Sequence, residues 1–168
     1  MDLTEVDECF EKGLLKEGAR SKKFALQDIA QAEFFLNESF DLISIQKKEM
    51  AAIAMYNAAF HAARALLYLG GIKERSHYCM QKYLEANFCK KGMLSQEELS
   101  LFDLLRGIRQ EVQYNVTKIK FEENLDELYD KTEKFIETVQ KIVKSRGAQN
   151  HGEKTVKPNG EAPRGVVK

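Results

Sequence analysis

The stretch MYNAAFHAARALLYLGG, residues 55–71, decides the fold. It predicts a helix that is apolar almost all round and rich in alanine, whose small side chains allow neighbouring helices to approach closely. Its polar side chains recur at i, i+4, i+7 and i+11, so they form one narrow stripe: Asn57, His61, Arg64 and Tyr68. The glycine pair at its end is a typical helix stop. We expect this helix in the middle of a bundle or of a dimer.

Composition and charge restrict the functions that the chain can have. The chain has 168 residues, of which 43% are hydrophobic, and Lys+Arg and Asp+Glu both number 26. This length suits one domain with a real core, and balanced charge gives no general attraction to nucleic acid or to membranes. No apolar run approaches the length of a membrane span, and the acidic N-terminus does not resemble a signal peptide. We therefore expect a cytoplasmic protein.

The cysteines point to the same compartment. Cys9, Cys79 and Cys89 are odd in number and lack C-x-x-C spacing. We interpret them as reduced thiols, neither paired in a disulfide nor arranged as a zinc site. The sequence predicts no bound metal and no cofactor.

Hydrophobic periodicity predicts helices along most of the chain. Both prolines, Pro158 and Pro163, lie near the end, and β-branched runs are scarce. The predicted helices cover residues 4–16, 21–43, 47–69, 76–91, a segment that starts at the capping box of Ser95, and residues 121–145. The predicted fold is all-α, an antiparallel bundle of about five to six helices that forms a homodimer. Residues 1–20 are a helical extension, 21–145 the bundle and 146–168 a disordered tail.

Individual stripes predict which side chains form the core. In the helix over residues 21–43 the inward positions are Ala25, Ile29, Ala32, Leu36, Phe40 and Ile43. In the segment after Ser95 the inward positions are Leu99, Phe102, Leu105, Ile108 and Val112. The other side of that segment carries Arg106, Arg109, Gln110 and Gln113, at i, i+3, i+4 and i+7.

Two interpretations of the polar side chains remain open. The stripe of Asn57, His61 and Arg64 is either structural, hydrogen-bonded to a neighbouring helix or to solvent, or one wall of a polar cleft. We favour the structural interpretation, because lone histidines are usually structural. The pair Arg106 and Arg109 is either an exposed surface, paired with Asp103 or Glu111, or a phosphate clamp.

The segments LQDIAQAEFFLNESFDLI and YNAAFHAARALLYLGG together resemble the HEPN domain (higher eukaryotes and prokaryotes nucleotide-binding). The similarity is to a small stand-alone branch whose third helix reads YYAxFHAARALL. Ser76 and His77, and later RQEVQY from Arg109 to Tyr114, fall where that branch has a Ser-His pair and R-x-x-A-D-Y. The resemblance implies an all-α dimer and links to RNA, to nucleotides and to small nucleotidyltransferase partners in toxin–antitoxin-type modules.

Catalytic HEPN proteins are similar to this chain only in part. The resemblance implies that an Arg, followed after four to six residues by a His, cleaves RNA without metal; Arg109 matches the Arg, and Tyr114 occupies the place of the His. Tyrosine, with an ordinary pKa of about 10, is ionised only to about one part in a thousand at neutral pH, so Tyr114 is expected to be a poor base and a competent hydrogen-bond donor. His61 is the other candidate for the catalytic proton transfer.

These observations lead to three functional hypotheses. The leading one is a homodimeric binding module that engages RNA or a nucleotide through Arg64, Asn57, Arg106 and Gln113, or pairs with a nucleotidyltransferase, or does both. The alternative is a metal-independent endoribonuclease that uses Arg109 with Tyr114 or His61. The third is a purely structural helical adaptor. Tyr114 favours binding over cleavage, so the sequence leaves enzymatic activity open.

Overall fold

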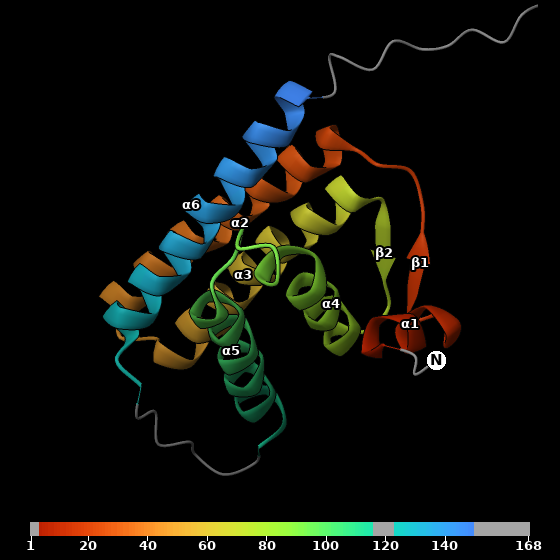
Figure 1. Cartoon of the computed structure of the whole chain (residues 1–168). Coiled ribbons are helices and arrows are strands. Elements are labelled where there is room, and N and C mark those ends of the chain that lie inside the picture. Colours follow the sequence, from red (N-terminus) through yellow and green to blue (C-terminus); the bar gives the residue numbers. More distant parts are fainter. Residues whose placement is uncertain (1–3, 116–122, 150–168) are drawn as a thin grey trace, which may run out of the picture.

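The computed structural model describes residues 4–115 and 123–149, and this part of the chain is almost entirely helical (Figure 1). Its α-helices are α1 Glu5–Glu11, α2 Lys22–Ser44, α3 Lys48–Gly70, α4 His77–Leu84, α5 Gln96–Tyr114 and α6 Leu125–Gln149. A π-helical turn, η1 Glu85–Cys89, extends α4, and two short strands, β1 Leu15–Glu17 and β2 Ile72–Glu74, flank the bundle. The predicted all-α bundle is confirmed.

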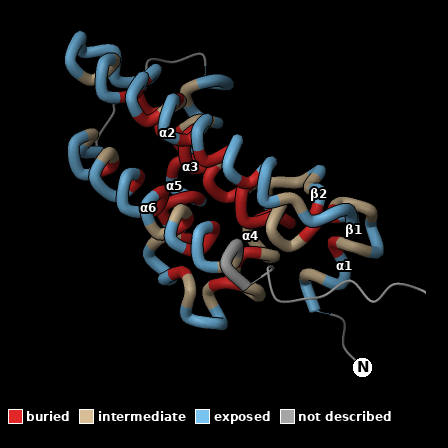
Figure 2. The backbone as a smooth tube through the Cα atoms, turned by 90° about the horizontal axis from the view of Figure 1, so that it is seen from above, coloured by how far each residue is buried: buried red, intermediate tan, exposed pale blue. Residues whose placement is uncertain are grey.

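Helix α3 lies at the centre of the bundle. It packs against α2, α4, α5 and α6, and Figure 2 shows its buried turns in the middle of the molecule. Its alanines Ala51, Ala52, Ala58, Ala59, Ala62, Ala63 and Ala65 are all fully buried. These small side chains let the neighbouring helices pack close to the α3 backbone, so the predicted central position of this helix is confirmed.

Local signals fix the ends of the long helices. The hydroxyl of Ser21 accepts a hydrogen bond from the backbone N–H of Phe24, and Ser95 forms a reciprocal capping box with Glu98. Gly71 ends α3 with a φ of 70°, in the left-handed region that glycine adopts without strain. A Cβ at Gly71 would also lie 2.6 Å from the carbonyl oxygen of Gly18, which passes alongside.

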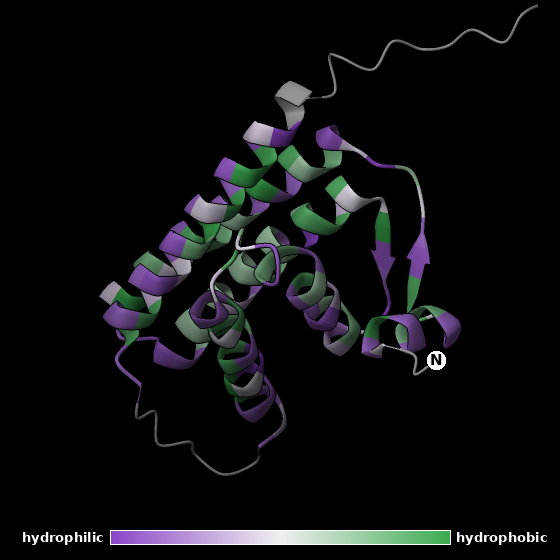
Figure 3. Ribbon diagram, in the orientation of Figure 1, coloured by the Kyte–Doolittle hydropathy of each residue, from purple (hydrophilic) through white to green (hydrophobic). Residues whose placement is uncertain are grey.

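The outer helix α6 is amphipathic. Figure 3 shows its apolar residues on the side toward the bundle and its polar residues on the outer side. Leu128, Phe135, Val139 and Ile142 are buried. The helix continues to Gln149, beyond its predicted end at residue 145. The rest of the predicted tail, residues 150–168, and the predicted start of this helix at residue 121 lie outside the described residues.

The predicted first helix is only partly correct. It ends at Glu11, and Leu15–Glu17 instead forms strand β1, which pairs antiparallel with β2 in the register Leu15↔Glu74. Strands this short carry too few residues to show an alternating pattern.

A second prediction was wrong at Phe40, whose side chain is 60% exposed. It lies at the far end of the α2 stripe and contacts the ring of Tyr129 on α6.

The predicted reduced state of the cysteines was wrong for two of them. Cys9 on α1 and Cys79 on α4 form a disulfide, with the two Cα atoms 5.8 Å apart, and Cys89 is free. The partners are 70 residues apart in sequence, so no local spacing revealed the pairing. The disulfide attaches α1 to the first turn of α4, and Lys82 in the last turn of α4 also forms an ion pair with Glu5.

Candidate functional site

One face of α3 is only partly covered by its neighbours. Its half-buried residues recur at three- and four-residue spacing, whereas the residues between them are buried: Ile53, Asn57, Phe60, His61, Arg64 and Tyr68. The predicted polar stripe therefore exists as a continuous strip, and it includes the aromatic ring of Phe60. Two clusters of polar side chains lie at its two edges.

The first cluster joins α3 to α2 through Asp28. The carboxylate of Asp28 accepts hydrogen bonds from Nε and Nη2 of Arg64, at 2.8 and 2.7 Å, and lies 2.8 Å from Nδ1 of His61. Asp28 is only 4% exposed. Burial opposes its ionisation, but the hydrogen bonds from Arg64 and His61 outweigh burial and lower the pKa of Asp28. For His61 and Arg64, the structural interpretation of the stripe is the one that these contacts support.

Sequence reasoning missed Asp28, although a signal was present. Asp28 comes three residues after Ala25 and four residues before Ala32, so it lies on the predicted inward stripe of α2. A carboxylate on an apolar face requires a partner, because burial of an unpaired charge is costly. The guanidinium of Arg64, on the facing helix, is that partner.

The second cluster brings α3, α4 and α5 together around Tyr56. The Tyr56 hydroxyl lies 2.7 Å from Nδ1 of His77, which is the first residue of α4. The guanidinium of Arg109, on α5, lies 4.9 Å from the centre of the Tyr56 ring, and the ring of Phe102 stacks beside it. Arg109 is therefore next to a histidine, but this histidine comes from another helix.

Burial and positive charge set the protonation states in this second cluster. Burial lowers the pKa of His77, and the charges of Arg109 and Arg106 lower it further. Burial also raises the pKa of Tyr56. Both groups are thus held in their neutral forms at neutral pH, which leaves the two arginines as the charged groups.

Phe60 connects the two clusters across the strip. Its ring centre lies 4.9 Å from the ring of His77 and 5.7 Å from the ring of His61. The guanidinium of Arg64 also lies over it, at 5.4 Å. Both histidines therefore lie next to one half-buried phenyl ring.

The other predicted site residues on α5 lie outside the Tyr56 cluster or pair with a neighbour on their own helix. Arg106 donates from Nη2 to Asp103 at 2.8 Å, one of the pairings expected for an exposed surface, while its Nε is buried without a partner among the described residues. Gln113 is exposed, and Tyr114 is 75% exposed at the last turn of α5. Residues five apart on a helix point about 140° apart. Arg109 and Tyr114 therefore do not face the same neighbours.

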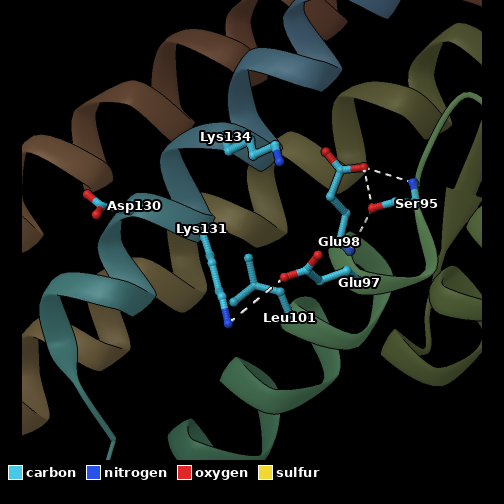
Figure 4. Close-up of a pocket in the computed structure, with 7 residues that line it drawn as sticks. All are labelled: Ser95, Glu97, Glu98, Leu101, Asp130, Lys131 and Lys134. Carbon is cyan, nitrogen blue, oxygen red and sulfur yellow. Dashed lines mark hydrogen bonds and ion pairs between the residues drawn. The ribbon is translucent and has the colours of Figure 1, made fainter.

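A surface cavity elsewhere is a weaker candidate. It has a volume of about 270 Å³ and lies between the start of α5 and α6, with the lining residues shown in Figure 4. Three of its charged residues already have partners, since Lys131 lies 4.0 Å from Glu97 and Glu98 caps its own helix at Ser95. This cavity is at the opposite end of α5 from Arg109, so it takes no part in the Tyr56 cluster.

The comparison with known families places both clusters inside one domain. The HEPN domain matches residues 27–142 of this chain, which is most of its length. The chain belongs to the HEPN domain family. No curated protein matches it. The HEPN match runs from the first turns of α2 to α6, so it contains Asp28, Tyr56, His77 and Arg109, whereas α1 and β1 precede it.

Among residues 4–115 and 123–149, no helix combines the length and the apolar character that crossing a membrane requires. The polar strip of α3 and the Tyr56 cluster are the features of this HEPN domain that offer polar and charged side chains to a ligand.

Proposed function

We propose that this HEPN domain binds RNA or a nucleotide, and that Arg109 is its principal phosphate contact. The observation that carries the proposal is the position of Arg109 over the ring of Tyr56, on the same face of α5 as Arg106. Within the described residues, no carboxylate forms an ion pair with Arg109, so its charge is available to a ligand. Guanidinium groups bind phosphate in a forked geometry, which gives both charge and direction.

The strip on α3 supports further parts of the proposal. Asn57 is half-buried on this strip, and it is an additional contact to the ligand in this proposal, together with the exposed Gln113. Arg64 is a further contact through the 31% of its side chain that stays exposed beside Asp28. We also propose that two copies pair through this strip, and that a small nucleotidyltransferase is the partner in a toxin–antitoxin-type module. A cytoplasmic location belongs to the same proposal, although the Cys9–Cys79 disulfide is of a kind that is rare in reducing compartments.

Binding of a fluorescein-labelled single-stranded RNA, followed by anisotropy, tests the proposal. Arg109→Ala should weaken binding about ten- to a hundredfold, the loss expected for one charge-assisted contact. Arg109→Lys should recover part of the affinity, because it keeps the charge and loses the fork. Lys144→Ala, which removes an exposed cation on α6, is the matched control and should bind like the wild type. Full binding by Arg109→Ala would leave the structural adaptor as the best account.

A second candidate function, RNA cleavage, is favoured by a different observation. The sequence placed no histidine on the helix of Arg109, but the fold brings His77 to the Tyr56 ring over which Arg109 lies. An endoribonuclease needs a group that accepts a proton at neutral pH, and a histidine beside the phosphate contact is suited to that role.

A further inference from the structure

We propose that the end of the bundle where α3 finishes carries a second binding surface, which holds phosphates of the RNA backbone through two arginines and two lysines. We call this surface the basic end, and it consists of Lys16, Arg20, Lys73, Tyr83 and Arg146. The inference rests on the proposed RNA binding and extends it to a surface that is separate from Arg109.

The basic end forms where the chain before α2 crosses the end of α3, beside the two short strands (Figure 1). The backbone N–H of Gly18 donates a hydrogen bond to the carbonyl oxygen of Gly71 at 2.6 Å. A Cβ at Gly71 would lie 3.0 Å from Cγ of Arg20, and a Cβ at Gly18 would lie 3.3 Å from Cε of Lys73. Both cationic side chains therefore lie against the same crossing.

Helix α4 adds a phenol hydroxyl to this crossing. Tyr83 is half-buried, and its hydroxyl lies so close to the last residue of α3 that a Cβ at Gly70 would collide with it. Within the described residues, Asn87 donates to the backbone carbonyl of Tyr83, and nothing hydrogen-bonds its hydroxyl. Burial raises the pKa of Tyr83, and the positive charges of Arg146 and Arg20 oppose that rise. Two guanidinium groups from different segments thus act on one hydroxyl.

Arg146 is held at this end by aromatic and sulfur contacts. Its guanidinium lies 5.1 Å from the centre of the Phe88 ring, and its Nη2 lies 3.6 Å from Sδ of Met93. Phe88 is only 1% exposed, so it is a fixed support, and its ring centre lies 6.5 Å from that of Tyr83. Arg109 is held over an aromatic ring in the same way. Such a contact positions a guanidinium without neutralising the charge that attracts a phosphate.

The two strands add a pair of lysines that repel each other. Lys16 and Lys73 are direct cross-strand partners, so they point to the same face of the strand pair. Like charges in that position are destabilising. The carboxylates of the strands, Glu17 and Glu74, alternate with the lysines and therefore point to the opposite face. The lysine face consequently has no neutralising residue from its own strands.

The start of α2 increases the positive charge further. Lys22 and Lys23 occupy its first turn, which has no acidic residue, although the helix dipole favours acidic side chains there. Among residues 4–115 and 123–149, no ion pair includes a cation of the basic end. The free protein therefore gathers uncompensated positive charge at one place, and bound phosphates would supply the missing negative charge.

The shape and the position of the basic end favour a polymer over a single nucleotide. The cations of β1, of β2 and of the segment before α2 are exposed and adjoin one another, so they form an open surface. Tyr56, below Arg109, and Gly70, beside Tyr83, are about four helical turns apart on α3, roughly 21 Å along its axis, and point to the same side of it. One RNA strand can contact both places through successive phosphates, whereas a mononucleotide is too short.

The test compares variants of the full chain that each remove one positive charge, with a fluorescein-labelled single-stranded RNA followed by anisotropy. Arg20→Gln and Arg146→Gln should each weaken binding about three- to tenfold. Because each loses a phosphate contact, each should also reduce the slope of log K against log salt concentration by about 0.7. Lys48→Gln, at an exposed position at the other end of α3, is the matched control and should keep the affinity and the slope of the wild type.

Lys73→Glu provides a readout that a purely structural role would not give. The variant places a carboxylate opposite Lys16 and removes the like-charge pair, so the midpoint of thermal unfolding should rise by about 1–3 °C. Binding should nevertheless fall further than in Arg20→Gln, because a negative charge then faces the phosphates. A lysine that served only the fold would not weaken binding when its replacement stabilises the protein.

The outcomes separate this inference from the proposed function. If the wild type binds RNA while Arg20→Gln and Arg146→Gln keep the affinity and the slope of the control, the basic end is overturned and Arg109 remains the phosphate contact. If the two variants weaken binding of uridine monophosphate but not of the RNA, the surface is a mononucleotide site and the backbone assignment is overturned. A wild type that binds no RNA overturns the proposed function, and this inference with it.

Discussion

The carboxylate of Asp28 accepts two hydrogen bonds from Arg64 across the interface of α2 and α3, with its side chain almost completely removed from solvent. This is the principal ionic contact that we find between the first long helix and the central helix. Because the same carboxylate also contacts His61, it fixes two of the polar groups on the α3 strip.

Removing this carboxylate should destabilise the fold. Asp28→Ala leaves Arg64 and His61 without their partner, and we expect a loss of about 2–3 kcal/mol in the free energy of unfolding. This is less than the roughly 3–5 kcal/mol typical of a fully buried pair, because the Arg64 side chain is 31% exposed. Urea denaturation measures the change. Asp41→Ala, at an exposed position of the same helix, should cost less than about 0.5 kcal/mol. Equal losses in the two variants would contradict the assigned role.

The same group makes a prediction for pH. The pKa of Asp28 is lowered in the folded protein, since hydrogen bonds from Arg64 and His61 outweigh the opposing effect of burial. Its contribution is therefore complete above the unfolded pKa of about 3.9 and is lost as the pH falls through the lower folded value. The stability difference between the wild type and Asp28→Asn should be constant from neutral pH down to about pH 5 and shrink below about pH 4. A difference that stays the same in acid would show that the charge is not what matters.

The disulfide between Cys9 and Cys79 predicts a measurable thiol count. Under denaturing, non-reducing conditions each chain should show one reactive thiol, that of Cys89, out of its three cysteines. Closure of a loop of 70 residues restricts the unfolded chain, so Cys9→Ser should lower the free energy of unfolding by about 2–4 kcal/mol. Cys89→Ser is the control and should leave stability nearly unchanged. Three reactive thiols in the freshly purified protein would show that the bond does not form in solution.

Helices and caps could be predicted because their causes are local. The stripe of α5, the capping box of Ser95 with Glu98 and the glycine stop at Gly71 all depend on residues within a few positions of one another. The core of α3 could be predicted for the same reason, since its alanines follow one continuous pattern. These signals were sufficient for the fold class and, with the motif around Arg109, for the family.

The site depended on distances that no local pattern encodes. His77 and Arg109 meet only because α4 and α5 both pack against α3 near Tyr56. The disulfide required the placement of α1 on α4, and the strand pair required β1 to reach β2. Each of these contacts joins segments that are distant along the chain, so spacing arguments could not reach them.

Dimerisation makes a prediction about the α3 strip. If two copies pair through this face, sedimentation at micromolar concentrations should show a dimer, because a half-buried strip with apolar members such as Ile53 and Phe60 is suited to a two-fold contact. Ile53→Arg places a charge in that contact and should shift the protein toward the monomer. Ile45→Arg, at the exposed end of α2, is the matched control for the added charge and should leave the dimer intact. A wild type that sediments only as a monomer would exclude this arrangement.

The last prediction compares the two ends of the RQEVQY segment. Tyr114 is exposed at the final turn of α5, whereas Arg109 is held against Tyr56 inside the second cluster. If Tyr114 contributes one neutral hydrogen bond to the bound RNA, Tyr114→Phe should weaken binding by about 1 kcal/mol, roughly fivefold, which is less than the loss in Arg109→Ala. It should leave any cleavage rate unchanged, because a protonated phenol is a poor proton acceptor. Metal-free cleavage that disappears in Tyr114→Phe while it persists in His77→Gln would return the proton transfer to α5. In that case the tyrosine at the place of the family histidine, and not the histidine of α4, would be the catalytic residue.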